Sequence, residues 1–596
     1  MKLSSRFTPI LVFVATFALY MTTLAPGMLR GDSGEFQWAM ASLNVAHATG
    51  YPLFTLIGYA WHLLPLDVNA AWQLNLLTPF FGALAVTTVF IFIRAVTERA
   101  AAAWIGAMFF ALTPVMWFNA SILEVYPLHA FLLALLLYLL WRWTRAQTSP
   151  DPSSRKRGDA FLYLAFFVLG LALAHHRLTV LALPAILYLL IATDHRFFLN
   201  LPRLLFCALL IVPGLLLYVY VPLRLLPEGY SLDYAFNDII LGREYAGSLL
   251  REINPRPVLL EFPFSNFHIG LALALIGALA LFRRAKHLNI ALWLVYVADV
   301  AFALVYSVPD VEVFLTSSFV VIALWIGAGA AFVIEWVGQR VGGKHAAWLQ
   351  LVYAAILLLI AFFGLTQFME IRTAVAAEAG PEARARAIAA SDAPPGAFLE
   401  LDWETATALR FLQATENLHP DLEARLIHLD QRAEFWLALQ NVDAGRAVWI
   451  ERGVKWTRAP AGYAVTVKQN DLAEITRVPA EMTRRRASVG DRVDLYGYQA
   501  TPDAFVLYWR VKKQLAKDLA TYVHYLDAQG NKIAQDDRAA CCEAVYGYRT
   551  REWEPGHTYA DVFKPAPPNT SSFLVGMYEN LNGDVEAYGE PVTIKQ

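Results

Sequence analysis

The sequence predicts a polytopic α-helical membrane domain, followed by an extracytoplasmic α/β segment and a β-sandwich-like domain. Hydrophobic residues make up 57% of the 596-residue chain and charged residues 16%, whereas soluble chains are roughly 45–50% apolar and about 25% charged. Long apolar runs fill the chain up to Phe368, and period-two segments separated by Gly, Asn, Asp and Pro fill its last part. We therefore expect a membrane domain over 1–369, an α/β region over 370–480 and a β-sandwich-like domain over 481–596.

About eleven apolar runs are long enough to cross a bilayer, which takes about 20 helical residues. The first run, 7–24, could also be a cleaved signal peptide. No clear small-x-small cleavage site precedes Pro26, so we expect a membrane span instead. The segment 53–64 is too short to cross and is expected to be a re-entrant or interfacial helix. The other runs are 71–93, 101–118, 128–143, 161–174, 178–192, 204–221, 269–282, 290–306, 313–336 and 346–368.

The short loops between these runs predict the orientation. Basic residues gather in alternate loops, which the positive-inside rule assigns to the cytoplasm; they include Arg94, Arg99, Arg142, Arg145, Arg155, Lys156, Arg157, Arg196, Arg203, Arg283, Arg284, Lys286, Arg340 and Lys344. The loop 26–70 and everything after Phe368 then lie outside the cytoplasm, in a multi-pass protein of the cell membrane. Because acids and cations converge on this one face, transfer chemistry is favoured over transport, which places polar residues at mid-membrane.

Beyond the first run, the stretch Gly31-Asp32-Ser33-Gly34-Glu35-Phe36 places two carboxylates at a membrane boundary. If this segment is helical, Asp32 and Glu35 share one face. A carboxylate beside aromatic side chains can be partly desolvated, which suits general-base catalysis. The alternative is a helix N-cap, with Asp32 or Ser33 capping and Glu35 in the first turn.

Cations on the same side are candidates for binding a phosphate. His176 and Arg177 follow one apolar run and Arg224 follows another, and guanidinium groups bind phosphate bidentately. The alternative is that these arginines snorkel to lipid head groups. For His47 there are two interpretations. It contacts the donor phosphate or the acceptor, or it only anchors a turn of the loop.

Other features carry less chemical information. Adjacent His175 and His176 point about 100° apart on a helix, and no third ligand is evident, so no metal site is expected. Asp310 and Glu312 read as solvated loop acids. Trp553 and the tyrosines of the last part suit sugar stacking or a sandwich core. Cys207, Cys541 and Cys542 do not make a disulfide framework, and no cationic domain predicts a nucleic-acid partner.

The stretch Gly31 to Glu35 and the later Val45-Ala46-His47 and Gly50-Tyr51-Pro52-Leu53 resemble a signature of the GT-C glycosyltransferases, in the transmembrane protein O-mannosyltransferase family. Ala48 and Thr49 depart from it, because prolines are usual there. Further similarity occurs at Glu124-Val125-Tyr126 and from His175 to Thr179. The resemblance covers the membrane half and hardly touches the last third.

The resemblance implies an inverting transferase with a GT-C fold and a catalytic first extracytoplasmic loop. Such enzymes take a polyprenyl-phosphate sugar as co-substrate, with mannose as the expected sugar and a protein or glycan hydroxyl as acceptor. Asp32 is then the expected base, Glu35 or Glu124 orients it or the acceptor, and His47, His176, Arg177 and Arg224 bind the donor phosphate. No resident cofactor is expected, although a divalent ion is compatible with this chemistry. The rival hypotheses are a transporter or flippase of a lipid-linked glycan, and an assembly protein with a degenerate site.

Overall fold

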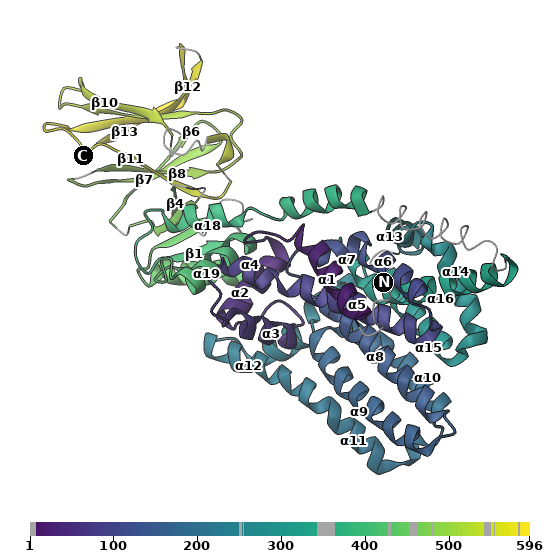
Figure 1. Cartoon of the computed structure of the whole chain (residues 1–596). Coiled ribbons are helices and arrows are strands. Elements are labelled where there is room, and N and C mark those ends of the chain that lie inside the picture. Colours follow the sequence, from purple (N-terminus) through teal and green to yellow (C-terminus); the bar gives the residue numbers. More distant parts are fainter. Residues whose placement is uncertain are drawn as a thin grey trace. The chain divides into compact units, whose positions relative to one another are not determined.

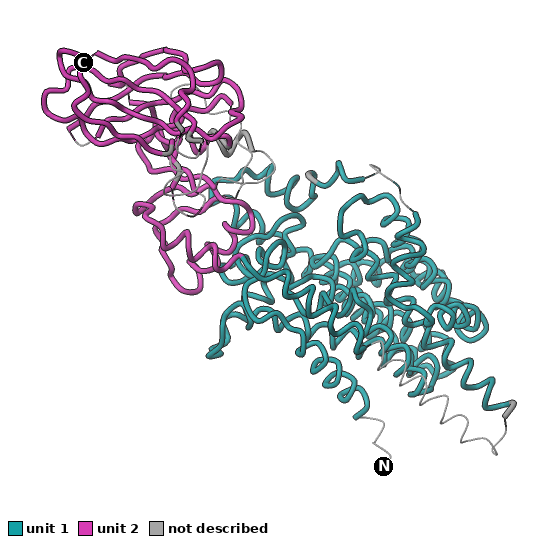
Figure 2. The backbone as a smooth tube through the Cα atoms, turned by 90° about the horizontal axis from the view of Figure 1, so that it is seen from above, with its two compact units in different colours: residues 1–380 teal, residues 381–596 magenta. Residues whose placement is uncertain are grey.

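The computed structural model contains two compact units, Met1–Gly380 and Pro381–Gln596 (Figures 1 and 2). The first unit consists of helices, and the second combines helices with two β-sheets. The structure describes residues 7–249, 253, 255–341, 364–426, 431–451, 463–468, 470, 472–479, 481–502, 504–540, 550–553, 555–581 and 584–595. Cys541, Cys542, Lys344 and most of the expected span 346–368 lie outside the described residues.

The helices of the first unit follow the apolar runs of the sequence. In chain order they are α1 (Thr8–Met21), α2 (Gly31–Ser42), α3 (Pro52–His62), α4 (Ala70–Asn75), α5 (Leu77–Thr97), α6 (Ala100–Ala111), α7 (Pro114–Asn119), α8 (Tyr126–Gln147), α9 (Pro152–His175), α10 (Leu183–Thr193), α11 (Leu201–Leu216), α12 (Tyr220–Leu225), α13 (Phe262–Phe267), α14 (Gly270–Arg284), α15 (Lys286–Val305) and α16 (Thr316–Val341). Residues 364–377 are also helical.

Short 3-10 and π-helical segments connect these helices. The 3-10 segments are η1 (Arg177–Ala182), η2 (Phe197–Leu199), η3 (Leu217–Val219), η4 (Leu226–Glu228), η6 (Arg243–Ser248) and η8 (Val311–Leu315), and the π-helical ones are η5 (Tyr234–Ile240) and η7 (Pro257–Glu261).

Membrane-spanning length is reached by six helical stretches of the described residues, or seven if the bent pair α13–α14 counts as one span. Three further helical stretches, including α1 and α6, are apolar but shorter. The expected polytopic helical domain is thereby confirmed, whereas the count of eleven spans stays a prediction. The interfacial or re-entrant placement of α3 also stays a prediction.

One expected span is broken in the structure. The run 101–118 forms two helices, α6 and α7, because Thr113 caps the second helix by accepting a hydrogen bond from the Met116 amide. Pro114 then occupies the first position of α7, where its missing N–H costs nothing. The sequence Thr-Pro inside an apolar run is the signal for this break.

Glycines let helices of this unit approach closely. A Cβ added to Gly214 of α11 would lie 2.1 Å from the backbone of Gly170 in α9, and one added to Gly277 of α14 would lie 1.8 Å from the Trp325 carbonyl oxygen in α16. Small residues at such crossings are typical of membrane helices, which associate through close packing.

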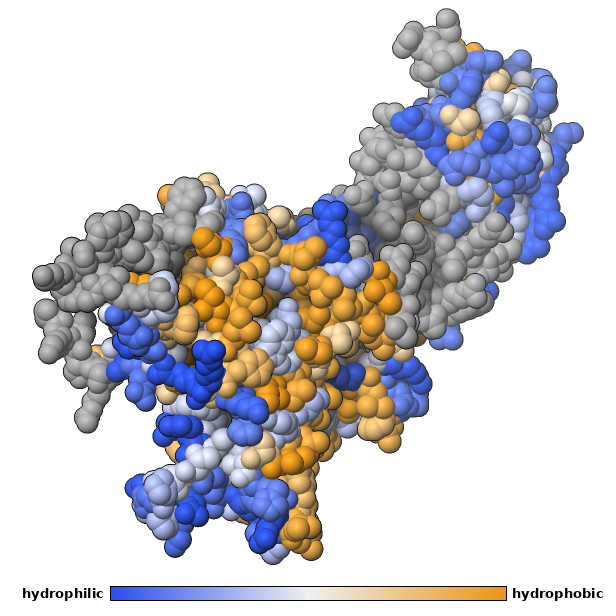
Figure 3. All heavy atoms as spheres, turned by 90° about the vertical axis from the view of Figure 1, so that its right-hand side faces the viewer, coloured by the Kyte–Doolittle hydropathy of each residue, from blue (hydrophilic) through white to orange (hydrophobic). Residues whose placement is uncertain are grey.

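Apolar side chains also cover much of the outer face of this unit (Figure 3). Large hydrophobic residues are exposed along α10, α11 and α14; they include Leu183, Leu187, Ile191, Leu205, Leu209, Leu216, Leu275 and Leu279. Extensive exposed apolar surface is unfavourable in water, and we expect it to face lipid.

The second unit contains a nine-stranded sheet in the order β2-β1-β3-β5-β4-β11-β8-β7-β6 and a four-stranded sheet in the order β10-β9-β12-β13. Its helices are α18 (Pro381–Ala389), α19 (Trp403–Glu416) and α20 (Gln431–Asp443), with a 3-10 segment η10 (Thr550–Glu552). Its strands are β1 (Phe398–Leu401), β2 (Glu423–Leu426), β3 (Val448–Glu451), β4 (Tyr463–Val467), β5 (Leu472–Arg477), β6 (Thr483–Val489), β7 (Val493–Ala500), β8 (Phe505–Val511), β9 (Ala520–Leu526), β10 (Lys532–Ala539), β11 (Thr558–Phe563), β12 (Ser572–Leu581) and β13 (Asp584–Lys595).

Parallel pairing of β1 with β2 and β3 accounts for the α/β part, and the later strands pair mainly antiparallel. Phe505 of the larger sheet stacks on Phe573 of the smaller one, with ring centroids 4.2 Å apart. The two sheets therefore share a sandwich core. Trp553 is fully buried in this core, so it cannot stack on a sugar. The larger sheet continues across residue 480, and the domain boundaries expected from the sequence stay predictions.

Candidate functional site

Helix α2 carries the acidic motif of the sequence. Its N-cap residue, Arg30, has an extended backbone, and no side chain caps the helix, so the capping interpretation of Asp32 and Ser33 is wrong. Asp32 lies in the first turn and Glu35 one turn later. The expectation that both acids share one helical face is confirmed, because both approach the same histidine ring.

That histidine is His47, in the loop between α2 and α3. Its Nδ1 lies 2.5 Å from Glu35 Oε2, and its backbone N–H donates to Glu35 Oε1 over 3.1 Å. Its Nε2 lies 3.6 Å from Asp32 Oδ2. Glu35 is buried, whereas 48% of the Asp32 side chain is exposed. The histidine therefore lies between a buried and an accessible carboxylate.

The charges around His47 determine its protonation. Burial by itself lowers the pKa of this imidazole, but the carboxylates of Asp32 and Glu35 and the hydrogen bond with Glu35 outweigh burial and raise the pKa to about 10. His47 is therefore an imidazolium at neutral pH, with a hydrogen on each ring nitrogen; Nδ1 donates to Glu35, and Nε2 forms an ion pair with Asp32.

Packing against later segments holds the His47 loop in place. Val45 belongs to a buried apolar cluster with Val221 of α12 and Ile239 of η5. The Tyr220 hydroxyl donates to the Asn44 carbonyl oxygen. Gly50 has φ of +73°, and a Cβ there would meet Val221 and Ile239 at 3.2 Å. Only glycine fits this turn without strain.

Glu124, between α7 and α8, lies behind the acidic helix. Its Oε1 accepts a hydrogen bond from Ser33 Oγ over 3.0 Å. Burial raises the pKa of Glu124, and the negative charge of Asp32 raises it further. The hydrogen bond from Ser33 and the positive charge of His47 lower the pKa, but they do not cancel the increase. Glu124 therefore connects to the motif through Ser33.

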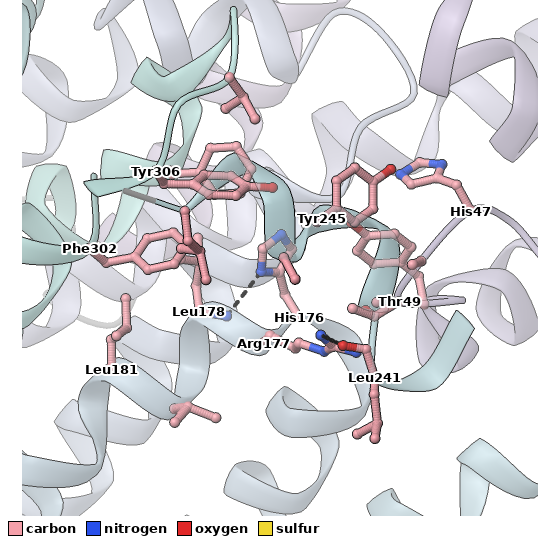
Figure 4. A pocket seen from close by; sticks show the side chains of 18 of the residues that line it. His47, Thr49, His176, Arg177, Leu178, Leu181, Leu241, Tyr245, Phe302 and Tyr306 are labelled. Carbon is pink, nitrogen blue, oxygen red and sulfur yellow. Dashed lines mark hydrogen bonds between the residues drawn. The ribbon is translucent and has the colours of Figure 1, made fainter. Parts of the chain in front are cut away.

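His176 follows the end of α9 and is buried among aromatic rings. Its Nδ1 accepts a hydrogen bond from the Leu178 amide over 3.2 Å (Figure 4). Since that nitrogen accepts, the proton of the neutral ring is assigned to Nε2. The ring centroids of Tyr126 and His129 lie 5.6 Å and 5.2 Å away. His176 thus retains one N–H donor for a ligand.

Arg177 begins η1 and is half-buried. Its Nη1 donates to the Leu241 carbonyl oxygen over 2.6 Å (Figure 4). Its Nη2 is buried and has no hydrogen-bond partner in the part of the chain that the structure describes. A buried guanidinium nitrogen without a partner is costly unless a ligand supplies one.

These residues meet at one cavity, hereafter the site cavity, with a volume of roughly 540 Å³, within the range of about 300–1,000 Å³ usual for ligand sites. Its polar lining comes from Asp32, His47, Thr49, Tyr51, Tyr126, His176, Arg177, Arg243, Tyr245, Tyr306 and Asp310. Its apolar lining includes Leu178, Val180, Leu181, Leu241, Leu249, Phe302, Val308 and Phe314. Figure 4 shows His176 and Arg177 between the His47 side and the Phe302 side.

The apolar side of the site cavity continues to the outer surface. Val180 and Leu249 line it and are 49% and 45% exposed. A ligand with a charged head and a hydrocarbon chain would meet matching surfaces at both ends.

Not every residue expected at the site lines this cavity. Glu35 and Glu124 lie behind its wall, and Arg224 of α12 does not line it. His175 turns away, because its Nε2 bonds the Val125 carbonyl oxygen over 2.8 Å. No group of three or more His, Cys, Asp or Glu side chains within the described ranges could hold a metal ion.

Some cavity residues have no signal, or only a weak one, in the sequence. Tyr51 lies inside the matched motif, but nothing in the motif marks it as a site residue. Tyr245 and Tyr306 lie in segments where aromatic residues are common, so they do not stand out either. Asp310 reads in the sequence as a solvated loop acid, yet it lines the same cavity as Asp32.

Comparisons with known proteins relate the same part of the chain to a family. Residues 32–197 match the family described as the protein O-mannosyl-transferase TMEM260 N-terminal domain. The protein O-mannosyl-transferase tmem260 of Dictyostelium discoideum is 24% identical over 294 residues, which are 46% of this chain and 36% of the relative. Protein O-mannosyl-transferase TMEM260 of Mus musculus is 31% identical over 215 residues, 35% of this chain and 29% of the relative. The matched parts thus span about a third of these relatives.

The fold is similar to solved structures of ArnT from Cupriavidus metallidurans. The structure bound to undecaprenyl phosphate has a TM-score of 0.54 and 13% identity and covers 80% of this chain and 99% of that chain. The apo structure has a TM-score of 0.52 and 13% identity, over 79% and 98% of the two chains. At this identity the likeness concerns the fold.

The expected resemblance is thus confirmed by the motif, the family match and the fold together. Residues 32–197 match the model of the TMEM260 N-terminal domain, and the fold of the chain is similar to that of ArnT.

Proposed function

We propose that this chain is a membrane glycosyltransferase that moves a sugar, with mannose as the expected one, from a polyprenyl-phosphate donor to an acceptor hydroxyl. The expected acceptor is Ser or Thr of a protein, with a glycan as the alternative, and the expected face is extracytoplasmic. The names of the relatives support protein O-mannosylation. The undecaprenyl phosphate bound to the structurally similar ArnT supports a lipid-linked donor.

The observation that carries this proposal is that Asp32 and Arg177 line the same cavity. An accessible carboxylate suits an acceptor hydroxyl, and a guanidinium suits a phosphate. The apolar lining near Val180 suits the first isoprene units of the donor. A flippase needs no base at its phosphate site, so this combination favours transfer.

The proposed reaction is a direct displacement. Asp32 takes the proton from the acceptor hydroxyl while the hydroxyl oxygen bonds to the anomeric carbon. The bond from that carbon to the phosphate oxygen breaks, its electron pair stays on the phosphate, and the anomeric configuration inverts. Arg177 and the Nε2–H of His176 stabilise the charge that develops on the departing lipid phosphate.

A direct test measures release of lipid phosphate by the purified full-length protein. The protein is incubated with a panel of polyprenyl-phosphate sugars. We expect one of them to release lipid phosphate, and only when an acceptor peptide rich in Ser and Thr is present. Asp32→Asn keeps the size of the side chain and removes its basicity, so turnover should fall about 10²–10⁴-fold.

Retained donor binding in Asp32→Asn, measured with radiolabelled polyprenyl phosphate, controls for folding. Absence of release with every donor in the panel would contradict the proposed transfer. Near wild-type turnover in Asp32→Asn, together with loss in Glu35→Gln or Glu124→Gln, would transfer the role of base to that glutamate.

A further inference from the structure

We propose that His47 is a positioning residue, which ties the base Asp32 to the buried Glu35, and that it does not bind the donor phosphate. This inference rests on the proposed function for its kinetic consequences, but its structural part can be tested without any transfer activity. It gives both acids of the motif a defined role.

The three side chains form a chain from the protein interior to the cavity. Only 2% of the Glu35 side chain is exposed, and its carboxylate accepts hydrogen bonds from the ring Nδ1–H and from the backbone N–H of His47. The opposite ring nitrogen faces Asp32, which is 48% exposed and lines the site cavity. An interior carboxylate thereby orients the ring, and the ring orients the carboxylate that meets substrate.

Aromatic neighbours restrict the tilt of the same ring. The ring centroid of Phe36 lies 5.5 Å from that of His47, and the ring centroid of Tyr51 lies 5.4 Å from it. With Glu35 holding one end, the imidazole has little freedom to turn toward a phosphate.

The charges that face His47 are mostly negative. Asp32, Glu35, Glu124 and Asp310 all interact with it, and His176 is the neighbouring imidazole. These carboxylates keep His47 protonated, as described above, so it has no lone pair to accept a proton from substrate. A phosphate would have to displace a carboxylate from one N–H group to bind there.

The three side chains Glu35, His47 and Asp32 also balance charge during the reaction. Before proton transfer, two carboxylates and one imidazolium have a net charge of about −1, and after Asp32 is protonated they are neutral. Glu35 still neutralises His47 at that stage, so proton uptake by Asp32 leaves no unpaired buried cation, which would be costly.

The kinetic test uses His47→Gln in the full-length protein. Glutamine keeps an N–H donor and removes the charge. We expect kcat to fall about 10–100-fold, as when an outer partner of a functional side chain is lost, with the donor KM unchanged.

A double-mutant cycle tests the connection to Glu35. Glu35→Gln should act on the same step, so the double variant should be no slower than the slower single variant. His62→Gln, at the end of α3 and away from the site cavity, is the matched control and should keep wild-type kinetics. Additive losses, or an increased donor KM with kcat retained in His47→Gln, would overturn the proposal.

A chemical test needs no activity. Diethyl pyrocarbonate acylates neutral imidazole, so His47 should resist it at pH 7 in the wild-type protein and should react faster in Glu35→Gln, as read by peptide mass spectrometry. Equal reactivity in the two proteins would refute the charge link even if transfer occurs. Suppose that the protein turns over no donor while His47 still reacts faster in Glu35→Gln than in the wild-type protein. That result would contradict the proposed function but would support the interaction of His47 with Glu35 and Asp32.

Discussion

Asp32 and Arg177 illustrate how much of the site depends on single side chains. Asp32 has an imidazolium on one side and open cavity on the other. Arg177 uses one guanidinium nitrogen on the Leu241 carbonyl and leaves another without a partner among the described residues. The first arrangement leaves an oriented carboxylate open to a substrate hydroxyl, and the second suits a phosphate oxygen.

Replacing Arg177 with lysine tests the second role. Lysine keeps the charge but cannot bond Leu241 and a phosphate with a planar fork, so donor binding should weaken by roughly 1.5–3 kcal/mol, the value of a charge-assisted hydrogen bond. Titration with radiolabelled polyprenyl phosphate measures this change.

Arg224→Lys is the matched comparison, since the sequence predicts that Arg224 binds phosphate but the residue does not line the site cavity. We expect a smaller loss for Arg224→Lys than for Arg177→Lys. The reverse order would place the phosphate at the end of α12, and unchanged binding in both variants would reduce both arginines to anchors at the lipid head groups.

At the scale of elements, the turn before α3 determines where His47 lies. The loop between α2 and α3 packs against α12 and η5 through Val45, and Gly50 makes the turn possible. The site therefore depends on contacts between segments that are far apart in the chain.

Gly50→Ala should destabilise the protein and lower turnover. Alanine at positive φ costs about 1–2 kcal/mol, and its Cβ would add contacts at 3.2 Å with Val221 and Ile239. Gly229→Ala is the matched control, because Gly229 has φ of +92° and nothing lies within 4 Å of a Cβ added there. Thermal unfolding in detergent should show the larger loss for Gly50→Ala; equal losses would mean that packing does not constrain this turn.

At the scale of the whole molecule, thiol labelling can measure which face of the membrane holds the site cavity. The basic short loops predict that it faces away from the cytoplasm. In a background without native cysteines, a membrane-impermeant thiol reagent applied to intact cells should label Asp67→Cys and Thr373→Cys, which are exposed positions.

Ser153→Cys, at the exposed start of α9, should be labelled only after the cells are opened. Labelling of Ser153→Cys in intact cells would invert the topology. The acceptor would then have to be cytoplasmic.

Local patterns are enough to predict several elements of this protein. The alternation of residues in 505–511 predicts β8, and the pattern from 405 onward predicts most of the helix over Trp403–Glu416. The motif from Gly31 to Glu35 indicates both acids and their common helical face. These features are local, since a helix or strand presents a face that its own residues determine.

The tertiary structure alone decided which cations join the acids. Arg177 lines the site cavity and Arg224 does not, although both follow an apolar run. His47 lies between Glu35 and Asp32 because its loop packs against α12 and η5. The sequence determined the chemical groups and the local faces that carry them, but which groups meet depends on packing between distant segments, whose spacing along the chain carries no signal.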